Sequence, residues 1–274
     1  MWPRVALYFF IMFGGAIAWT LSQGETLTPR GFIAALFAGS LIAVAMWFRW
    51  DWAPKARRER MQRKARAMII AVDGPTASGK GTIARALAER YRLPHLDTGL
   101  LYRAVGRQVF LDGGNPDDPA DALAATSFPE ALLADPHLRN EATGGLASRV
   151  SIHPTVRQAL FERQRTFATQ PGGAVLDGRD IGTVIAPEAQ VKLFVIASVE
   201  ARAHRRWKEM HDRGIPASLD DIAKDLRRRD ARDTQRKDAP LRAAPDAIIL
   251  DTSALGRNEA IAAAIEAVER VLRG

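Results

Sequence analysis

A glycine-rich segment at residues 74–82 constrains the fold of this chain more than any other feature. An apolar run, Met68–Val72, precedes it, and apolar residues at helical spacing, from Ile83 to Ala88, follow it. A strand, a glycine-rich turn and a helix in this order form a phosphate-binding loop, because backbone N–H groups and the helix N-terminus face an anion. Lys80 would add a full positive charge at the β- and γ-phosphates of a nucleoside triphosphate. The residues predicted to bind ATP are Gly74, Pro75, Thr76, Ala77, Ser78, Gly79, Lys80, Gly81 and Thr82.

The end of this loop departs from the commonest pattern. Gly81 stands where most phosphate loops carry the Ser or Thr that meets magnesium, and Thr82 comes one position later. The Gly-Lys-Gly-Thr form resembles the loop of nucleoside monophosphate kinases. It favours a small kinase over a GTPase or a motor protein.

Composition removes several classes of site. The chain has no cysteine, which excludes disulfides, thiolate metal sites and cysteine nucleophiles. The net charge is +8, but residues 49–66 alone hold eight basic and two acidic residues. Because most of the excess charge sits in this short segment beside an apolar region, we expect no nucleic-acid partner.

Residues 1–50 contain two uncharged runs, Val5–Leu21 and Gly31–Phe48. Each is near the lower limit of about 17–25 residues needed to span a bilayer. Five of the six tryptophans lie at the ends of these runs, where aromatic residues meet the membrane interface. The basic segment that follows, residues 51–67, is expected to stay in the cytoplasm. The pattern predicts a two-helix transmembrane hairpin, over about 5–21 and 31–48, that tethers a cytoplasmic domain to the inner membrane.

Other interpretations of the N-terminal region remain open. Residues 1–18 resemble a cleaved signal peptide that ends at Ala18, although such a peptide would export an ATP-using domain away from ATP. The two runs could also be buried core helices. A translation start at Met61 or Met68 would give a plain cytoplasmic protein.

From Met68 onward, apolar strands alternate with helical patterns. We predict strands at 68–72, 93–97, 174–177, 191–196 and 247–251, and helices at 99–111, 154–168, 199–214, 219–237 and 258–273. Residues 116–145 show short helical pieces and no clear strand. Strands that are apolar throughout and separated by helices predict an α/β fold, a five-stranded parallel sheet with helices on both faces. Ligands of such sheets bind at the carboxyl ends of the strands.

Five separated motifs resemble those of the cytidylate kinase family, bacterial enzymes that phosphorylate CMP and dCMP with ATP. They are Asp73–Thr82, Asp97–Arg103, Val156–Arg165, Asp177–Thr183 and Arg229–Arg236. The resemblance spans Met68 to about Leu272. It implies a P-loop nucleoside monophosphate kinase fold over 68–274, with an acceptor-binding region at about 98–170 and a lid at about 219–240. It also implies a monomeric kinase domain, with Mg²⁺ arriving on ATP.

The resemblance implies roles for individual residues. Those expected at the cytosine edge are Thr98, Arg157 and Asp180. Those expected at the ribose are Ser148, Arg229 and Asp233. Tyr102 is expected in the CMP site. The catalytic residues would be Lys80, with Arg103, Arg179 and Arg236 at the acceptor phosphate. Thr82 and Asp177 would reach magnesium through water, with no direct protein ligand.

Two other functions remain open at this point. A kinase for another monophosphate, such as AMP or UMP, would share the fold, and a membrane-anchored nucleotide sensor or scaffold would keep the fold without turnover. Residues 103–157 lack the small β-rich insertion of the longer family members. Base selectivity is therefore looser here, or residues 126–151 provide it with helices.

Overall fold

The computed structural model describes residue 28 and residues 68–273 of the 274-residue chain, and the helices and strands of this described part all lie within residues 68–273. The transmembrane hairpin and the basic linker predicted for residues 1–67 lie outside the described residues, apart from Thr28. Within the described part of the chain, no helix combines the length and the apolar character needed to cross a membrane.

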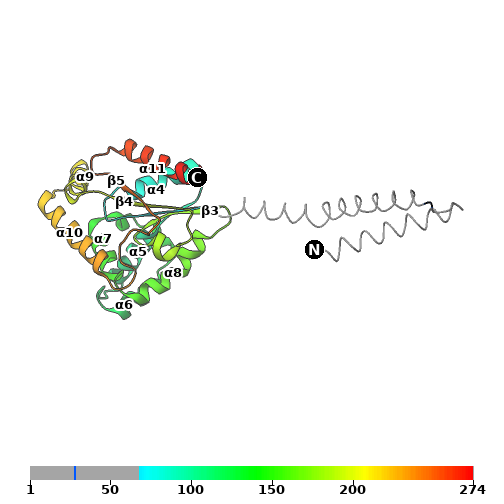
Figure 1. The fold of residues 1–274 in the computed structure, drawn as a ribbon. Coiled ribbons are helices and arrows are strands. Elements are labelled where there is room, and N and C mark those ends of the chain that lie inside the picture. Colours follow the sequence, from blue (N-terminus) through cyan, green and yellow to red (C-terminus); the bar gives the residue numbers. More distant parts are fainter. Residues whose placement is uncertain (1–27, 29–67, 274) are drawn as a thin grey trace. The chain divides into compact units, whose positions relative to one another are not determined.

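Residues 68–273 are built around a five-stranded sheet in the order β2-β3-β1-β4-β5 (Figure 1). The strands are β1 (Met68–Asp73), β2 (His95–Asp97), β3 (Gly173–Gly178), β4 (Val191–Ile196) and β5 (Ile248–Asp251). Every pairing between them is parallel, as the apolar strands predicted. The second strand begins two residues later than expected. Pro94 has no N–H to donate, although its carbonyl accepts a hydrogen bond from the Val175 N–H at 2.9 Å.

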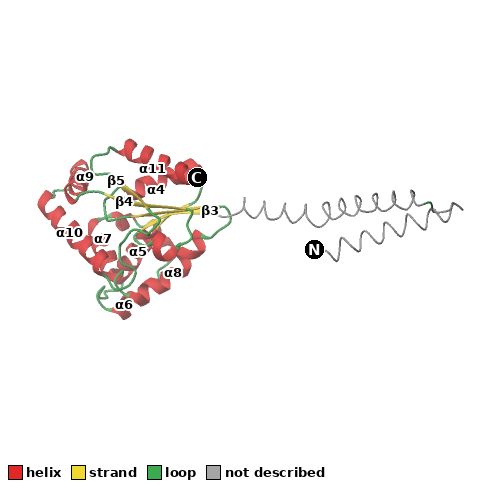
Figure 2. Cartoon of the chain, in the orientation of Figure 1, coloured by secondary structure: helices red, strands yellow, loops and turns green. Residues whose placement is uncertain are grey.

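Helices fill the intervals between the strands (Figure 2). They are α4 (Lys80–Tyr91), α5 (Thr98–Leu111), α6 (Pro119–Ala124), α7 (Glu141–Val150), α8 (Pro154–Ala168), α9 (Val199–Asp212), α10 (Leu219–Gln235) and α11 (Arg257–Arg273). Three short 3₁₀ segments lie between α6 and α7, at 125–127, 130–134 and 136–139. Residues 116–145 contain no strand, as predicted. A π turn, Ile181–Ile185, follows β3.

Both faces of the sheet are covered, as the two sets of alternating residues in β1 show. Ile70 and Val72 pack in one cluster with residues of α4 and α11. Ile69 and Ala71 face the other way and pack with residues of α8 and of the π turn. A further buried cluster joins α5, α6 and α8. Figure 1 shows α4 and α11 on one side of the sheet and α5 and α8 on the other. The predicted α/β fold, a five-stranded parallel sheet with helices on both faces, is confirmed for residues 68–273.

The strand order brings three informative loops together. Strands β2, β3 and β1 are neighbours, so the segments that follow Asp97, Gly178 and Asp73 leave the same edge of the sheet side by side. This edge is where parallel α/β sheets bind ligands.

Candidate active site

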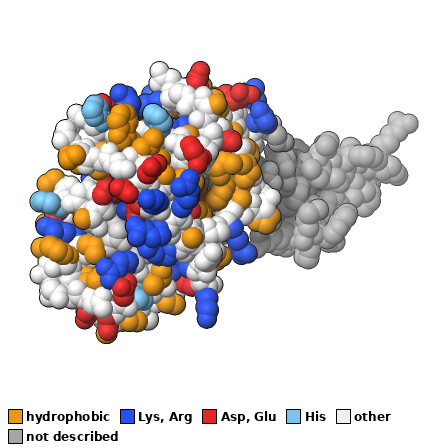
Figure 3. All heavy atoms as spheres, turned by 90° about the vertical axis from the view of Figure 1, so that its left-hand side faces the viewer, with side chains coloured by type: hydrophobic (Ala, Val, Ile, Leu, Met, Phe, Trp, Pro, Cys, Tyr) orange, Lys and Arg blue, Asp and Glu red, His pale blue; other side chains and the backbone are white. Residues whose placement is uncertain are grey.

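An open cavity of about 1500 Å³ lies at the carboxyl edge of the sheet. Its walls come from the phosphate loop, the loops after β2 and β3, α7 and α10. Of the site residues predicted from the sequence, all except Gly74 and Pro75 line it. Figure 3 views the molecule from the side on which α9 and α10 lie in Figure 1, and Lys and Arg side chains gather near the centre of this face with Asp and Glu among them. The cavity is suited to a polyanion.

The backbone of the phosphate loop requires glycine at two positions. Gly74 has a φ of +155°, and a Cβ placed there would lie 2.1 Å from the carbonyl oxygen of Val195. Gly79 has a φ of +90° and leads directly into α4. Lys80 donates from Nζ to the Pro75 carbonyl at 3.3 Å, so its ammonium group lies over the loop. Burial, reinforced by the nearby Arg179 charge, lowers the pKa of Lys80 to about 8.

Two polar groups in and beside the loop make contacts that the sequence did not predict, one in the predicted loop residue Ser78 and one in Asp73, which was not selected as a site residue. The Ser78 hydroxyl is buried and has no hydrogen-bond partner among the described residues. Asp73, the last residue of β1, accepts hydrogen bonds from the N–H groups of Ile181 and Gly182 at 2.9 and 2.8 Å. Burial raises the pKa of Asp73 to about 7, against the effect of these two bonds. Asp73 thus ties the phosphate loop to the turn after β3.

A buried ion pair joins α8 to the loop after β3. The Arg157 guanidinium is hydrogen-bonded to the Asp180 carboxylate, and both side chains are 7% exposed. Arg157 also lies 5.7 Å from the ring centroid of Tyr102 and 3.3 Å from the carboxylate of Asp238. The Arg236 guanidinium is 3.8 Å from Asp180. The burial of Asp180 raises its pKa, which the neighbouring arginines oppose.

Two predicted residues make contacts with the protein frame. The Thr98 hydroxyl donates to the Asp177 backbone carbonyl at 2.8 Å, which fixes the start of α5 to β3. The Ser148 hydroxyl accepts a hydrogen bond from Arg232, a residue of α10 that sequence reasoning did not select. Both residues also line the cavity, and their roles toward a nucleotide stay predictions.

Two cationic groups converge over Gly144 in α7. A Cβ at Gly144 would lie 3.0 Å from a nitrogen of Arg103 and 3.0 Å from a nitrogen of Arg229. Arg103 donates to the carbonyls of Leu138 and Asn140 at 2.8 and 2.9 Å, which fixes its direction. Burial, reinforced by the nearby Arg229 charge, lowers the pKa of Arg103 to about 10. Arg229 is also paired with the carboxylates of Asp225 and Glu141, at 2.7 and 3.2 Å, so Arg103 is the cation of this pair whose charge is left for an anion in the cavity.

Oxygen ligands of the kind that magnesium prefers lie beside the phosphate loop. Asp177 of β3 lies opposite Asp97 of β2 in the register of the parallel strands. The Asp177 carboxylate lies 3.5 Å from the position that a Cβ of Gly81 would take. His95 Nε2 lies 2.8 Å from Oδ1 of Asp177. Burial raises the pKa of Asp97, and the Asp177 charge raises it further. These carboxylates and the Thr82 hydroxyl fit a hydrated Mg²⁺. The part of the chain that the structure describes holds no cluster of three or more His, Asp or Glu suited to a metal.

The residues that sequence reasoning missed share one property, which is that their partners are remote in the chain. Besides Asp73, His95 and Arg232, they include Arg202, whose guanidinium bonds to both the phosphate loop and α10. Asp97 was also not selected as a site residue, although it begins the motif Asp97–Arg103.

Comparison with known proteins agrees with this geometry. The sequence model of the family described as cytidylate kinase matches residues 70–270. The chain is 53% identical over 204 residues to a protein named cytidylate kinase from Caulobacter sp. (strain K31), a match that covers 74% of this chain and 94% of that protein. It is 52% identical over 208 residues to the cytidylate kinase of Rhodopseudomonas palustris (strain TIE-1), covering 76% of this chain and 98% of that protein. It is 54% identical over 202 residues to the cytidylate kinase of Xanthobacter autotrophicus, covering 74% of this chain and 97% of that protein. The match therefore takes in the phosphate loop, the Arg157–Asp180 pair and the arginines of the cavity together, and on this evidence the chain belongs to the cytidylate kinase family.

Proposed function

We propose that this chain transfers the γ-phosphoryl group of ATP to CMP or dCMP, giving ADP and CDP or dCDP. One observation carries the proposal: a single cavity joins a phosphate loop to a second basic region that contains the buried Arg157–Asp180 pair. The relatives bearing the name cytidylate kinase, at 52–54% identity over nearly their whole length, support the same reaction.

The two ends of the cavity suit the two substrates. Lys80 and the N-terminus of α4 would hold the β- and γ-phosphates of ATP. At the other end, the Asp180 carboxylate would accept from the exocyclic amino group of cytosine, and Arg157 would donate to the oxygen and nitrogen on the same edge. Because a uracil presents a carbonyl where cytosine presents the amino group, a carboxylate at that position disfavours UMP.

Phosphoryl transfer needs charge neutralisation and alignment more than a protein base. The CMP phosphate is itself the nucleophile, and Arg103, Arg179 and Arg236 would hold it in line with the γ-phosphate. Tyr102 would pack beside the base, and Ser148, Arg229 and Asp233 would meet the ribose. Mg²⁺ bound to ATP would screen the phosphate charge, with Asp177 and Thr82 orienting its water ligands.

The test is ADP release by the purified full-length chain with ATP and Mg²⁺ and either CMP, dCMP, UMP or AMP. We expect turnover with CMP and dCMP, little with UMP or AMP, and none from a folded Lys80→Ala variant. Tight ATP binding without turnover on any acceptor would favour the sensor function instead. Retained turnover in Lys80→Ala would remove the phosphate loop from the reaction.

On the sequence alone, we further propose that residues 1–50 tether this kinase to the membrane, with residues 51–67 on the cytoplasmic side. The two uncharged runs and the basic segment after them support this placement. The test is membrane fractionation of the native protein, combined with mass spectrometry of its N-terminus. A carbonate-extractable protein, or a native N-terminus at Met61 or Met68, would contradict it.

A further inference from the structure

Arg202 is a buried arginine in the first turn of α9 that the proposed reaction does not use. Its side chain is 4% exposed. Its Nε donates to the Ala197 carbonyl at 2.9 Å, and one terminal nitrogen donates to the Thr76 carbonyl at 3.1 Å. The two terminal nitrogens also form a two-pronged pair with the Asp230 carboxylate, at 3.0 and 2.6 Å. One guanidinium therefore joins the end of β4, the phosphate loop and α10.

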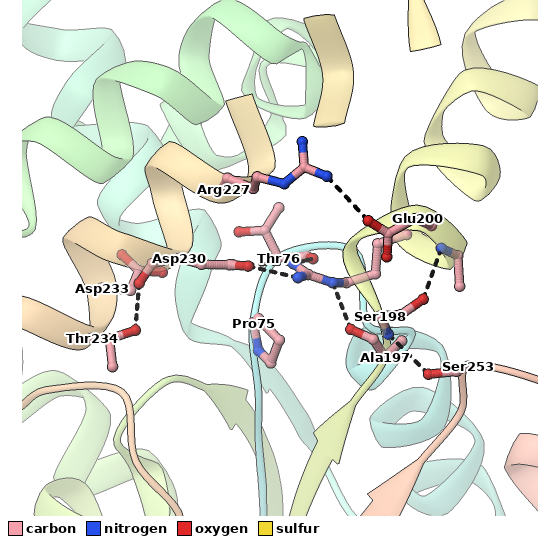
Figure 4. Close-up of polar contacts among 12 residues, drawn as sticks. Pro75, Thr76, Ala197, Ser198, Glu200, Arg227, Asp230, Asp233, Thr234 and Ser253 are labelled. Atoms are coloured by element: carbon pink, nitrogen blue, oxygen red, sulfur yellow. Dashed lines mark hydrogen bonds and ion pairs between the residues drawn. The ribbon is translucent and has the colours of Figure 1, made fainter. Parts of the chain in front are cut away.

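The base of this side chain is fixed. The Ser198 hydroxyl caps α9 by accepting from the Ala201 N–H at 3.1 Å, and the Ser198 N–H donates to the Ser253 hydroxyl at 2.9 Å (Figure 4). Ala197 and Ser198 directly follow β4, and Arg202 lies in the first turn of α9, six residues after the last residue of the strand. Because the planar guanidinium is hydrogen-bonded on several sides, it fixes the phosphate loop and α10 relative to the end of β4.

A second arginine links the same two elements at the same residue. Arg179 donates to the Thr76 hydroxyl at 2.6 Å and to the Asp233 carboxylate at 2.8 Å. Thr76 is thus bridged to α10 twice, through its carbonyl to Asp230 and through its hydroxyl to Asp233. Asp230 and Asp233 are three residues apart and share one face of α10.

The two bridges differ in their relation to the cavity. Arg179 and Asp233 line it, and in the proposed reaction both would turn to substrate atoms, which opens their mutual bond. Arg202 and Asp230 do not line the cavity, so a bound nucleotide would leave that bridge in place. In that reaction, one bridge would be exchanged for contacts with the substrate, while the other would keep α10 against the phosphate loop.

We propose that Arg202 is a positioning residue that, through Asp230, holds α10 in register with the phosphate loop while the Arg179–Asp233 bond opens for substrate. The register matters because α10 and the residue after it carry Arg229, Asp233 and Arg236. We call the Arg202–Asp230 pair, together with the bond from Arg202 to the Thr76 carbonyl, the joint. Its loss leaves the catalytic groups intact but lowers the fraction of molecules in which they face ATP. This inference rests on the proposed function.

The test compares Asp230→Asn, which weakens the joint but leaves the other Arg202 contacts, with Arg202→Lys, which keeps the charge and loses the two-pronged pair. A charge-assisted hydrogen bond typically corresponds to about 10-fold or more in an equilibrium, so we expect kcat to fall about 10-fold in Asp230→Asn. The KM for ATP should change less than kcat. Combining the two substitutions should cost less than the product of the single effects, because both remove the same interaction.

The structure supplies a matched control. Arg227 of α10 pairs with Glu200 of α9 at 3.1 Å, so it joins the same two helices, but both side chains are exposed and neither contacts the phosphate loop (Figure 4). Arg227→Gln should leave kcat within about twofold, as expected for an exposed ion pair. Equal kcat in Asp230→Asn and Arg227→Gln would overturn the proposal. A purely structural role would lower the melting temperature of Asp230→Asn without this drop in kcat.

A second readout does not depend on turnover. In full-length protein with ATP and Mg²⁺, amide hydrogen exchange over residues 219–235 should be faster in Asp230→Asn than in wild type or Arg227→Gln, with α4 and β1 unchanged. Unchanged exchange in α10 would contradict the joint even if the protein phosphorylates CMP. Faster exchange in a protein without CMP kinase activity would support the joint and refute the proposed function, which separates the two outcomes.

Discussion

Replacing Arg157 by methionine should reduce both the stability of the domain and its affinity for CMP. The Arg157 and Asp180 side chains are each 7% exposed, and the next cation, Arg236, lies 3.8 Å from Asp180. Removing one partner of a buried ion pair leaves an uncompensated charge and costs about 3–5 kcal/mol. In a domain of this size about 1 kcal/mol shifts the melting temperature by about 2–4 °C, so a fall of about 6–20 °C is expected.

The pH dependence of this loss has a defined sign. Burial raises the pKa of Asp180 above its value in the unfolded chain, and losing the Arg157 charge raises it further. A group whose pKa is raised by folding favours the folded state at low pH. The destabilisation of Arg157→Met should therefore shrink as pH is lowered from about 7.5 toward about 5, as measured by thermal unfolding.

The effect on CMP separates recognition from stability. Losing a charge-assisted contact to the base corresponds to about 1.5–3 kcal/mol, or about 10- to 150-fold in the KM for CMP. The KM for ATP should stay within about twofold. The assay is ADP release at about 20 °C, titrating each substrate at saturating concentrations of the other.

Two further variants make this result decisive. The double variant Arg157→Met with Asp180→Leu replaces the pair by apolar groups and should recover part of the stability but not CMP affinity; the recovery is partial because the buried Arg236 also loses Asp180. Arg163→Met is the matched control, because Arg163 also lies on α8 and 5.7 Å from an aromatic ring, that of Phe128, but is exposed. Equal increases in the two KM values, or recovery of CMP affinity in the double variant, would refute the role assigned to Arg157.

Residues of the phosphate loop and of the strand before it can be tested in the same way. Because burial lowers the pKa of Lys80 to about 8, kcat/KM for ATP should fall about tenfold per pH unit above pH 8, while Lys80→Arg should lack this break in its pH–rate profile. Gly74→Ala should destabilise the domain by about 2–5 kcal/mol in chemical denaturation, because its Cβ would meet the Val195 carbonyl. The control is Gly113→Ala, which also has a positive φ but open space around it, and it should cost about 1 kcal/mol or slightly more. Asp73→Ala should cost about 2–4 kcal/mol by leaving two buried N–H groups unpaired, and a melting temperature equal to that of wild type would exclude the tie between the loop and the π turn.

Local pattern predicted the fold because a few adjacent residues are enough to specify each element. Helix α8 begins at Pro154 and ends at Ala168 as expected, since proline suits the first helical turn and apolar residues recur at helical spacing. The strands were recognisable because both of their faces are buried. Element ends differ from the prediction by a few residues, and α10 stops at Gln235, two residues before the predicted Lys237.

The site was predictable only in part, because its remaining members depend on contacts between distant segments. Arg202 looks like an ordinary polar residue in the first turn of a capped helix, yet its partner Thr76 is 126 positions away. Asp73 looks like the end of a strand, and its bonds to Ile181 and Gly182 exist only once β1 and β3 are neighbours. No periodicity or motif spacing encodes such pairings before the topology is known.

The central place of β1 in the sheet has a consequence for how the protein is made. β1 is the first strand of residues 68–273 to leave the ribosome, but it pairs with β3 and β4 rather than with the strand that follows it. The first of these partners lies about a hundred residues later, so at about 5–20 residues per second the apolar residues of β1 wait on the order of 5–20 s for a neighbour. During that interval they are a target for chaperones and for other nascent chains. The phosphate loop, which directly follows β1, takes its shape only after most of the kinase has been translated.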